Sequence, residues 1–316
     1  MKIVSSAKIR KDLQEQLVQE FPQMNFEFYK SMEEAEASLK TADVLITLGE
    51  DVTPEHINSA EHLQWMMVIS AGMDKLPFEE LKAKNIQVTN ARGIHKSPMA
   101  EYTFAMILDY ARQRNVIRGQ EQAKLWNRRV TMTEINQQTL GVLGAGAIGE
   151  EIGRIGSAFG METLACTRSG KPSDNFTATY TSEELHSFLN RCDYVVSVLP
   201  ATDVTYHMAG EAFFKAMKAE AVFMNIGRGQ TVNENALLDA LDKKEITHAI
   251  LDVFEEEPLP GSHPFWEHSS VTVTPHISGI SPQYQDRAIA LFVENLHMYL
   301  ADGRFAVNEV NLDRGY

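Results

Sequence analysis

Short runs of apolar residues alternate with charged, helix-forming stretches from the start of the chain onward. In the N-terminal part the apolar runs predict strands at Ile3-Val4, Phe26-Tyr29, Val44-Leu48, Met66-Ile69 and Ile86-Val88. The stretches between them predict helices, for example over Arg10–Glu20 and Met32–Lys40. Because strands that alternate with helices form βαβ units, this pattern predicts an α/β domain with a parallel sheet.

The pattern changes at Ser97 and Pro98, which predict a helix start because a capping hydroxyl is followed by proline at the first helical position. Apolar residues then recur at helical spacing from Ala100 to Ala111. Residues 113–138 are polar and irregular. We expect them to form a second helix and an arm with a role in subunit contact.

A second series of strands and helices begins at Thr139 and runs to about Ser278. Its predicted strands are Leu140-Leu143, Thr163-Cys166, Tyr194-Val198, Ala221-Asn225, His248-Leu251 and Val271-Thr274. A final helix with apolar residues between Ile289 and Leu300 is free to pack back on the first domain. We therefore expect a discontinuous first domain, 1–97 plus 283–316, and a second domain at 98–282.

Composition narrows the class of protein. The chain has 316 residues, 29 of them basic and 43 acidic, and the net charge of −14 argues against non-specific nucleic-acid binding. No segment offers about 18 uninterrupted apolar residues, so no membrane span is expected. Cys166 and Cys192 lie in apolar, strand-like surroundings without metal-ligand spacing, so we expect no metal. With no apolar signal segment after Met1, we expect a cytoplasmic protein.

A glycine motif, Gly144-Ala145-Gly146-Ala147-Ile148-Gly149, lies between a predicted strand and a helical stretch. In that context Gly144 allows a tight turn, Gly146 lets a pyrophosphate approach the backbone, and Gly149 allows close helix–strand packing. The helix N-terminus, with Ala147 and Ile148, would face the phosphates. The alternative is a glycine-rich turn without a ligand. We favour a dinucleotide site.

The end of the next strand bears on the choice between NAD(H) and NADP(H). An acidic residue about 20 positions after the glycines would bind the ribose hydroxyls of NAD. Thr167 stands there instead, followed by Arg168, Ser169 and, two further on, Lys171. A guanidinium and a hydroxyl suit a 2′-phosphate. NADP(H) is therefore favoured and NAD(H) possible, unless Arg168 is only a solvated loop residue.

Three further stretches each follow a predicted strand: Asn225–Gly229, Asp252–Pro258 and Pro275–Gly279. Together with the glycine motif, and in this order, they resemble the D-isomer-specific 2-hydroxyacid dehydrogenases over essentially the whole chain. The Arg168-Ser169 pair and the closing residues 313–316 are most similar to the NADPH-preferring glyoxylate/hydroxypyruvate reductase group.

The resemblance implies two Rossmann-like domains, with parallel sheets flanked by helices and the active site in the cleft between them. It implies a homodimer that reduces a small 2-keto acid, such as glyoxylate or hydroxypyruvate, to the D-2-hydroxy acid. Domain 98–282 would bind the dinucleotide, with Pro200 and Asp252 among the cofactor-binding residues. The other domain would hold the substrate carboxylate on backbone amides of Ala71, Gly72 and Met73.

The same resemblance points to His276 as the proton donor, Glu257 as its partner and Arg228 as the group that orients the substrate. A histidine suits proton delivery because its ordinary pKa is about 6.5. A guanidinium can bind a carboxylate bidentately and polarise a carbonyl, so Arg228 and His276 would both touch substrate. Of the neighbouring glutamates, Glu255 and Glu256 are expected to be solvated.

Several points stay open on the residues alone. Met99 is as easily a core residue as a ligand contact, and Trp126 could border the substrate cleft or a subunit interface. One alternative function is a dinucleotide-sensing protein of the same fold without turnover. Another is a member of the same family that acts on a phosphorylated hydroxy acid.

Overall fold

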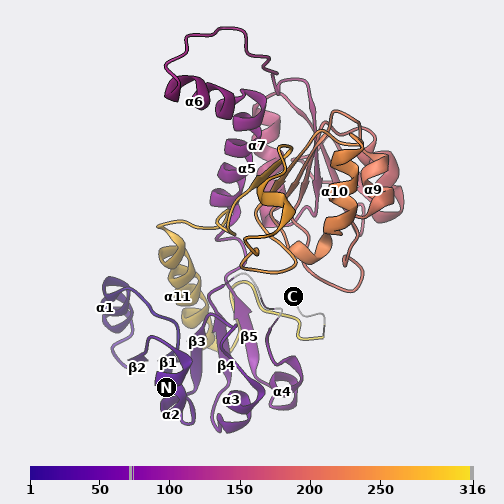
Figure 1. Cartoon of the computed structure of the whole chain (residues 1–316). Coiled ribbons are helices and arrows are strands. Elements are labelled where there is room, and N and C mark those ends of the chain that lie inside the picture. Colours follow the sequence, from indigo (N-terminus) through magenta and orange to yellow (C-terminus); the bar gives the residue numbers. More distant parts are fainter. Residues whose placement is uncertain (71–72, 74, 314–316) are drawn as a thin grey trace. The chain divides into compact units, whose positions relative to one another are not determined.

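The structure is a computed structural model that describes residues 1–70, 73 and 75–313. The chain divides into two compact units (Figure 1). Unit 1 comprises Met1–His95 and Ser281–Tyr316, and unit 2 comprises Lys96–Ile280. The expected domain boundaries each lie two residues further along the chain.

In the described part of unit 1, five parallel strands form one sheet in the order β2-β1-β3-β4-β5. The strands are β1 (Lys2–Ser5), β2 (Asn25–Phe28), β3 (Val44–Thr47), β4 (Trp65–Val68) and β5 (Gln87–Asn90). The helices are α1 (Lys11–Glu20), α2 (Met32–Leu39), α3 (Pro54–Ser59), α4 (Phe78–Ala83) and α11 (Tyr284–Asp302). Each strand overlaps one of the predicted apolar runs.

Helix α11 belongs to the core of unit 1, although it comes from the far end of the chain. Its residues Ile289, Phe292 and Leu296 are buried against the sheet. The ring of Phe292 stacks on Trp65 of β4, with 5.1 Å between the ring centroids. Full burial of one such side chain contributes about 1.5–3 kcal/mol, so this contact holds the C-terminal segment firmly on unit 1.

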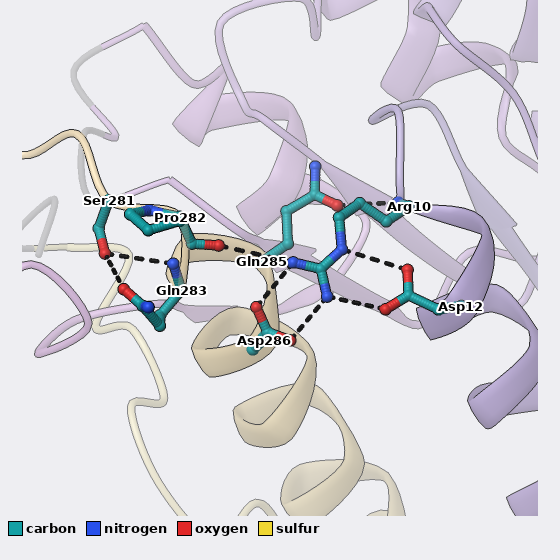
Figure 2. Close-up of polar contacts among 7 residues, drawn as sticks. All are labelled: Arg10, Asp12, Ser281, Pro282, Gln283, Gln285 and Asp286. Carbon is teal, nitrogen blue, oxygen red and sulfur yellow. Dashed lines mark hydrogen bonds and ion pairs between the residues drawn. The ribbon is translucent and has the colours of Figure 1, made fainter.

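A charge cluster at the start of α11 ties this helix to α1 (Figure 2). The Arg10 guanidinium donates to Asp12 at 2.8 Å and to Asp286 at 2.7 Å, and the Arg10 amide donates to Gln285 at 2.8 Å. Hydrogen bonds from Arg10 lower the pKa of both carboxyl groups. The cluster therefore stabilises the fold above the ordinary carboxyl range and loses this effect as the pH falls. Because the groups are exposed, the contribution is small.

Unit 2, all of whose residues are described, contains a seven-stranded parallel sheet in the order β12-β11-β10-β9-β6-β7-β8. Its strands are β6 (Thr139–Leu143), β7 (Glu162–Thr167), β8 (Ala178–Thr181), β9 (Tyr194–Ser197), β10 (Val222–Asn225), β11 (His248–Leu251) and β12 (Val271–Val273). Its α-helices are α5 (Lys96–Ala111), α6 (Arg114–Gln122), α7 (Ala147–Ala158), α8 (Leu185–Leu189), α9 (Glu211–Ala216) and α10 (Glu234–Asp242). Single 3-10 turns cover η1 (Ser182–Glu184), η2 (Gly229–Thr231) and η3 (Pro264–Trp266). The predicted α/β class with helix-flanked parallel sheets is confirmed.

Both faces of the unit 2 sheet are buried, as is typical of parallel sheets. Strand β10 shows this directly, because Val222 and Met224 belong to the core beneath α5 and α7. Phe223, between them in sequence, belongs to the opposite core beneath α8, α9 and α10. A strand with both faces buried reads as a continuous apolar run, which explains why these strands were predictable.

Two elements of unit 2 depart from the predictions. Strand β8 (Ala178–Thr181) was not predicted, because this edge strand is only half-buried and its Ala-Thr-Tyr-Thr sequence has no apolar run. Helix α5 begins at Lys96, because a turn over residues 92–95 leads directly into it, so Ser97 lies inside the helix and does not cap it. In the described residues no helix is long and apolar enough to cross a lipid bilayer.

Candidate active site

The predicted cofactor and catalytic residues of unit 2 all follow the carboxyl ends of its strands. Parallel strands end at the same edge of a sheet, and open α/β sheets bind their ligands at that edge. Along the sheet order the residues are His276 after β12, Asp252 and Glu257 after β11, Arg228 after β10, Pro200 after β9, Gly144–Gly149 after β6, and Thr167–Ser169 at the end of β7. One edge therefore carries the whole set.

In the turn between β6 and α7, glycine stands at each motif position for a different structural reason. Gly144 has a φ of 96°, which favours glycine. A Cβ on Gly149 would lie 2.1 Å from the Gly144 carbonyl oxygen, so only glycine lets the helix pack this closely on the turn. A Cβ on Gly146 would meet nothing within 4 Å. The protein itself does not require glycine at position 146, and the open space there suits a ligand that approaches the backbone.

Helix α7 begins directly after Gly146, and no side chain caps its N-terminus. The backbone N–H groups of the first turn, which starts with Ala147 and Ile148, are therefore available to an anion, and the helix dipole favours negative charge there. The open backbone at Gly146 and this uncapped helix start fit the pyrophosphate of a dinucleotide.

At the end of β7 the side chains of Arg168 and Ser169 are exposed. The hydroxyl of Thr167 accepts a hydrogen bond from the Gly170 amide at 3.0 Å, which shapes the loop. Among the described residues, no hydrogen bond or ion pair holds the Arg168 guanidinium. Arg168 therefore extends from this edge with its charge available to a ligand.

Arg228 follows β10 in a rigid loop. The side chain of Asn225 accepts from the Gly227 amide at 3.1 Å and donates to the Arg228 carbonyl at 2.9 Å. The Thr231 hydroxyl donates to the same carbonyl at 2.7 Å. A Cβ on Gly229 would lie 1.9 Å from the carbonyl carbon of Phe254, so this loop packs directly against the loop that follows β11.

Glu257 and His276 form a direct pair. Glu257 Oε2 lies 2.7 Å from His276 Nδ1, while Oε1 accepts from the Phe254 amide at 3.0 Å. A carboxylate accepts only, so Nδ1 carries the proton in this contact and Nε2 is left for a ligand. Half of the His276 side chain is exposed, at 52%. The ring is thus fixed on one side and accessible on the other.

Asp252 is fully buried and organises the backbone around His276. Its carboxylate accepts from the amides of Ile277 and Ser278, both at 2.9 Å, and from the Thr274 hydroxyl at 2.6 Å. Its carbonyl accepts from the His276 amide at 2.9 Å. His276 itself has a φ of 53°, an uncommon value for a residue with a side chain, and this network holds it there. A contact of Asp252 with the cofactor remains a prediction.

Tyr102 of α5 extends the network around Asp252. Its hydroxyl lies 2.6 Å from the Thr274 hydroxyl, and burial raises the pKa of Tyr102 to about 12. Neither residue stood out in the sequence, because they lie 172 positions apart and neither belongs to a motif. The stretch singled out in the sequence, Pro275–Gly279, begins one residue after Thr274 and indicated the histidine alone.

The remaining predicted positions are distributed over both units. Of the expected substrate loop in unit 1, Ala71 and Gly72 lie outside the described residues, and Met73 is buried with its sulfur accepting from Asn90. In unit 2 the Pro200 carbonyl accepts from the Thr205 hydroxyl at 2.7 Å. Met99 packs against the unit 2 core and Trp126 is 93% exposed.

A cavity of about 430 Å³ lies beside the Glu257–His276 pair. It is lined by Phe254, Glu257, Pro258, Leu259, Trp266, Val273, Pro275 and His276.

Comparison with known proteins agrees with this geometry. The model of the D-isomer specific 2-hydroxyacid dehydrogenase NAD binding domain matches residues 104–278, which is more than half of the chain. The protein belongs to the D-isomer-specific 2-hydroxyacid dehydrogenase family. The resemblance inferred from the motifs is thereby confirmed, and the chain is an NAD(P)-dependent 2-hydroxyacid dehydrogenase that uses a nicotinamide dinucleotide.

Individual relatives cover most of the chain. A glyoxylate reductase from Aeropyrum pernix is 34% identical over 86% of this chain and 84% of its own. A glyoxylate/hydroxypyruvate reductase B from Escherichia coli is 32% identical over 84% of each chain. A crystal structure of a family member from Aeromonas salmonicida is similar, with a TM-score of 0.88, 31% identity and 99% coverage of both chains. The similarity therefore extends over both units.

Proposed function

We propose that this protein reduces small 2-keto acids of the glyoxylate and hydroxypyruvate type to D-2-hydroxy acids, with NADPH as the preferred cofactor. The observation that carries the proposal is the Glu257–His276 pair, 2.7 Å apart, on the same sheet edge as Arg228 and the open glycine turn. Names of relatives supply the substrate class, since those from Aeropyrum pernix and Escherichia coli are glyoxylate reductases.

His276 delivers the proton in this proposal. Reduction of a keto group needs a proton at the carbonyl oxygen, and Nε2 is the ring atom that faces away from Glu257. The Glu257 carboxylate keeps the proton on Nδ1, orients the ring and stabilises the positive charge of the doubly protonated imidazole. Asp252 holds the backbone amides of His276 and Ile277, while Glu257 holds the ring itself.

Arg228 orients the substrate and polarises its carbonyl. A guanidinium presents parallel N–H donors that match the carboxylate and carbonyl oxygens of a 2-keto acid. Its backbone is held by Asn225 and Thr231, and its guanidinium donates to the Gly227 carbonyl at 2.8 Å. The charge is therefore held at this sheet edge, where it can stabilise the negative charge that develops on the carbonyl oxygen.

The dinucleotide would be held by the glycine turn, with its pyrophosphate at Gly146 and the N-terminus of α7. When bound, it supplies the hydride. Arg168 and Ser169, exposed at the end of β7, would contact the 2′-phosphate that distinguishes NADPH. Neither Thr167 nor the two residues after it is a carboxylate, so nothing there repels that phosphate.

Replacing Arg168 with alanine should raise the KM for NADPH about 10- to 100-fold, as expected for loss of hydrogen bonds to a charged group. The KM for NADH should stay the same, because NADH lacks the 2′-phosphate. Initial rates with each cofactor at saturating keto acid measure both values. Equal losses with the two cofactors would remove Arg168 as the phosphate contact.

The substrate class is tested with purified protein and a panel of 2-keto acids. Glyoxylate, hydroxypyruvate, pyruvate and a branched-chain keto acid are each incubated with NADPH and with NADH, and the loss of nicotinamide absorbance is followed. We expect glyoxylate and hydroxypyruvate to be reduced fastest. Faster reduction of the branched-chain acid would contradict the proposed substrate class. Oxidation of a phosphorylated hydroxy acid alone would favour the alternative of a family member that acts on such a substrate.

We also propose that the protein is a homodimer that uses α6 and the arm after it. No residue of α6 is buried, and the apolar side chains of Val116, Leu125 and Trp126 are exposed. A cavity of about 520 Å³ lies along this segment, lined by Ile117, Gln120, Glu121, Lys124, Leu125, Trp126, Asn127 and Arg128. Apolar surface of this kind on an acidic chain is best covered by a second copy.

Sedimentation velocity tests the dimer. The wild-type protein should have about twice its chain mass of 35.5 kDa. Trp126→Ser should shift the distribution toward the monomer, because it removes a large apolar anchor. Val204→Ser is the matched control, since Val204 is also exposed, at 81%, but lies outside the arm. A monomeric wild-type protein would overturn the proposal.

A further inference from the structure

Three consecutive glutamates, residues 255–257, have different surroundings in the structure. Glu257 contacts His276. Glu255 was expected to be solvated, but its carboxylate pairs with His207 Nε2, and its amide donates to the carboxylate of Glu234 at 3.1 Å. Among the described residues, Glu256 has no such partner. Two of the three glutamates, Glu255 and Glu257, therefore link this loop to neighbouring segments.

His207 is itself rigidly held. Its ring stacks on Tyr206, with 4.0 Å between the centroids, and only 29% of its side chain is exposed. Its amide donates to the Gln230 carbonyl at 2.9 Å, and its φ of 50° places it in a tight turn. Gln230 lies two residues after Arg228, so His207 joins the loop after β9 to the loop of the proposed substrate-orienting arginine.

Glu234, the second partner of Glu255, is fixed from its other side. Glu234 Oε2 lies 3.3 Å from His263 Nε2, and the two side chains are only 16% and 19% exposed. His263 Nδ1 accepts from the Phe265 amide at 3.3 Å. A ring that accepts at Nδ1 carries its proton at Nε2, the atom that lies next to the Glu234 carboxylate. Glu234 therefore remains an acceptor for the Glu255 amide.

These contacts converge on the segment that carries Glu257. The Phe254 amide donates to Glu257, and the next amide in the chain, that of Glu255, donates to Glu234. The Phe254 backbone also lies against Gly229, next to Arg228. The segment that carries Glu255 therefore contacts both Glu257 and the loop of Arg228.

We infer that Glu255 is a positioning residue, held by His207 and Glu234, that keeps Glu257 aligned with His276 and the loop of Arg228 packed beside it. It touches no reacting atom in this scheme and acts through Glu257. The inference rests on the proposed function for its kinetic consequence, because misalignment of a catalytic group by a fraction of an ångström is costly only where that group takes part in the reaction.

Kinetics of Glu255→Ala test the consequence, with Glu256→Ala as the matched control on the adjacent residue. Glu255→Ala should lower kcat about 10-fold and leave the KM for NADPH unchanged, because Glu257 is no longer held in line with His276 while the cofactor site is untouched. Glu256→Ala should match the wild type. His207→Asn, which tolerates the positive φ but is too short to reach Glu255, should reproduce the Glu255→Ala kinetics. The kcat of a double variant that combines Glu255→Ala and His207→Asn should be no lower than that of either single variant.

Hydrogen exchange measured by mass spectrometry tests the alignment without any turnover. In Glu255→Ala and His207→Asn, amides of the 252–258 segment should exchange faster than in the wild type, while Glu256→Ala should leave them unchanged. Equal exchange and equal kcat for the Glu255 and Glu256 variants would overturn the inference. If the wild type reduces no keto acid, the proposed function fails, but the exchange comparison still decides whether Glu255 holds this segment.

Discussion

Replacing His276 with asparagine should lower kcat for keto-acid reduction by about 10²- to 10⁴-fold, the usual contribution of a positioned general acid. Asparagine adopts positive φ more readily than most residues, so the φ of 53° at this position should persist and the fold should be retained. Cofactor binding should change little, because the glycine turn and α7 lie elsewhere along the sheet edge. Steady-state kinetics and a fluorescence titration with NADPH measure the two effects.

Glu257→Gln tests the contribution of the carboxylate that is paired with His276. Glutamine keeps the size of the side chain and can still accept from His276 Nδ1, but it cannot stabilise the positive charge of the ring. The kcat for keto-acid reduction should therefore fall by about 10-fold, less than in His276→Asn, and steady-state kinetics measure the difference. A His276→Asn protein that reduces substrate at the parent rate would show that the proton comes from another group.

Replacing Arg228 with glutamine should lower kcat/KM for the keto acid by about 10²- to 10³-fold, as for the loss of other preset donors to a developing oxyanion. The loop should survive the change, because Asn225 and Thr231 bind the backbone of residue 228 rather than its side chain. Arg228→Lys should rescue only part of the loss, since an ammonium cannot bind two oxygens in the parallel geometry of a guanidinium.

The control for Arg228 is Arg154→Gln, which removes an exposed arginine on α7 that pairs with Glu151. This change should leave kcat/KM within a factor of two of the wild type, which separates the effect of a specific guanidinium from that of one lost positive charge. Dissociation constants for NADPH should be the same in both variants. A parental kcat/KM in Arg228→Gln would exclude a role for this arginine in substrate binding.

Where a property depends on adjacent residues, the sequence was enough to predict it. Inner strands of unit 2 such as β10 were predictable because all their residues are buried, so that runs such as Val222–Asn225 are nearly continuous in apolar residues. The glycine turn was predictable because its shape depends on local sterics, such as the 2.1 Å approach of a Cβ at Gly149 to Gly144. Strand β8 lacked that signal because it lies at the sheet edge.

Interactions between distant residues were not predictable in this way. Nothing in the local sequence links Tyr102 to Thr274, or His207 to Glu255, because each pair is brought together only by the order of the strands. Local sequence also could not show which of the three glutamates, residues 255–257, pairs with His276. The choice of Glu257 came from the family resemblance. The 2.7 Å contact with His276 supplies the physical reason for that choice. Its catalytic role remains a proposal until the variants are measured.

The most direct test of the central claim is to incubate the purified protein with NADPH and hydroxypyruvate, and to determine the configuration of the glycerate that forms. We predict rapid oxidation of NADPH with D-glycerate as the product. NADPH binding without oxidation by hydroxypyruvate or glyoxylate would contradict the claim and favour a dinucleotide-sensing protein. Formation of L-glycerate would contradict the stereochemistry expected from the family.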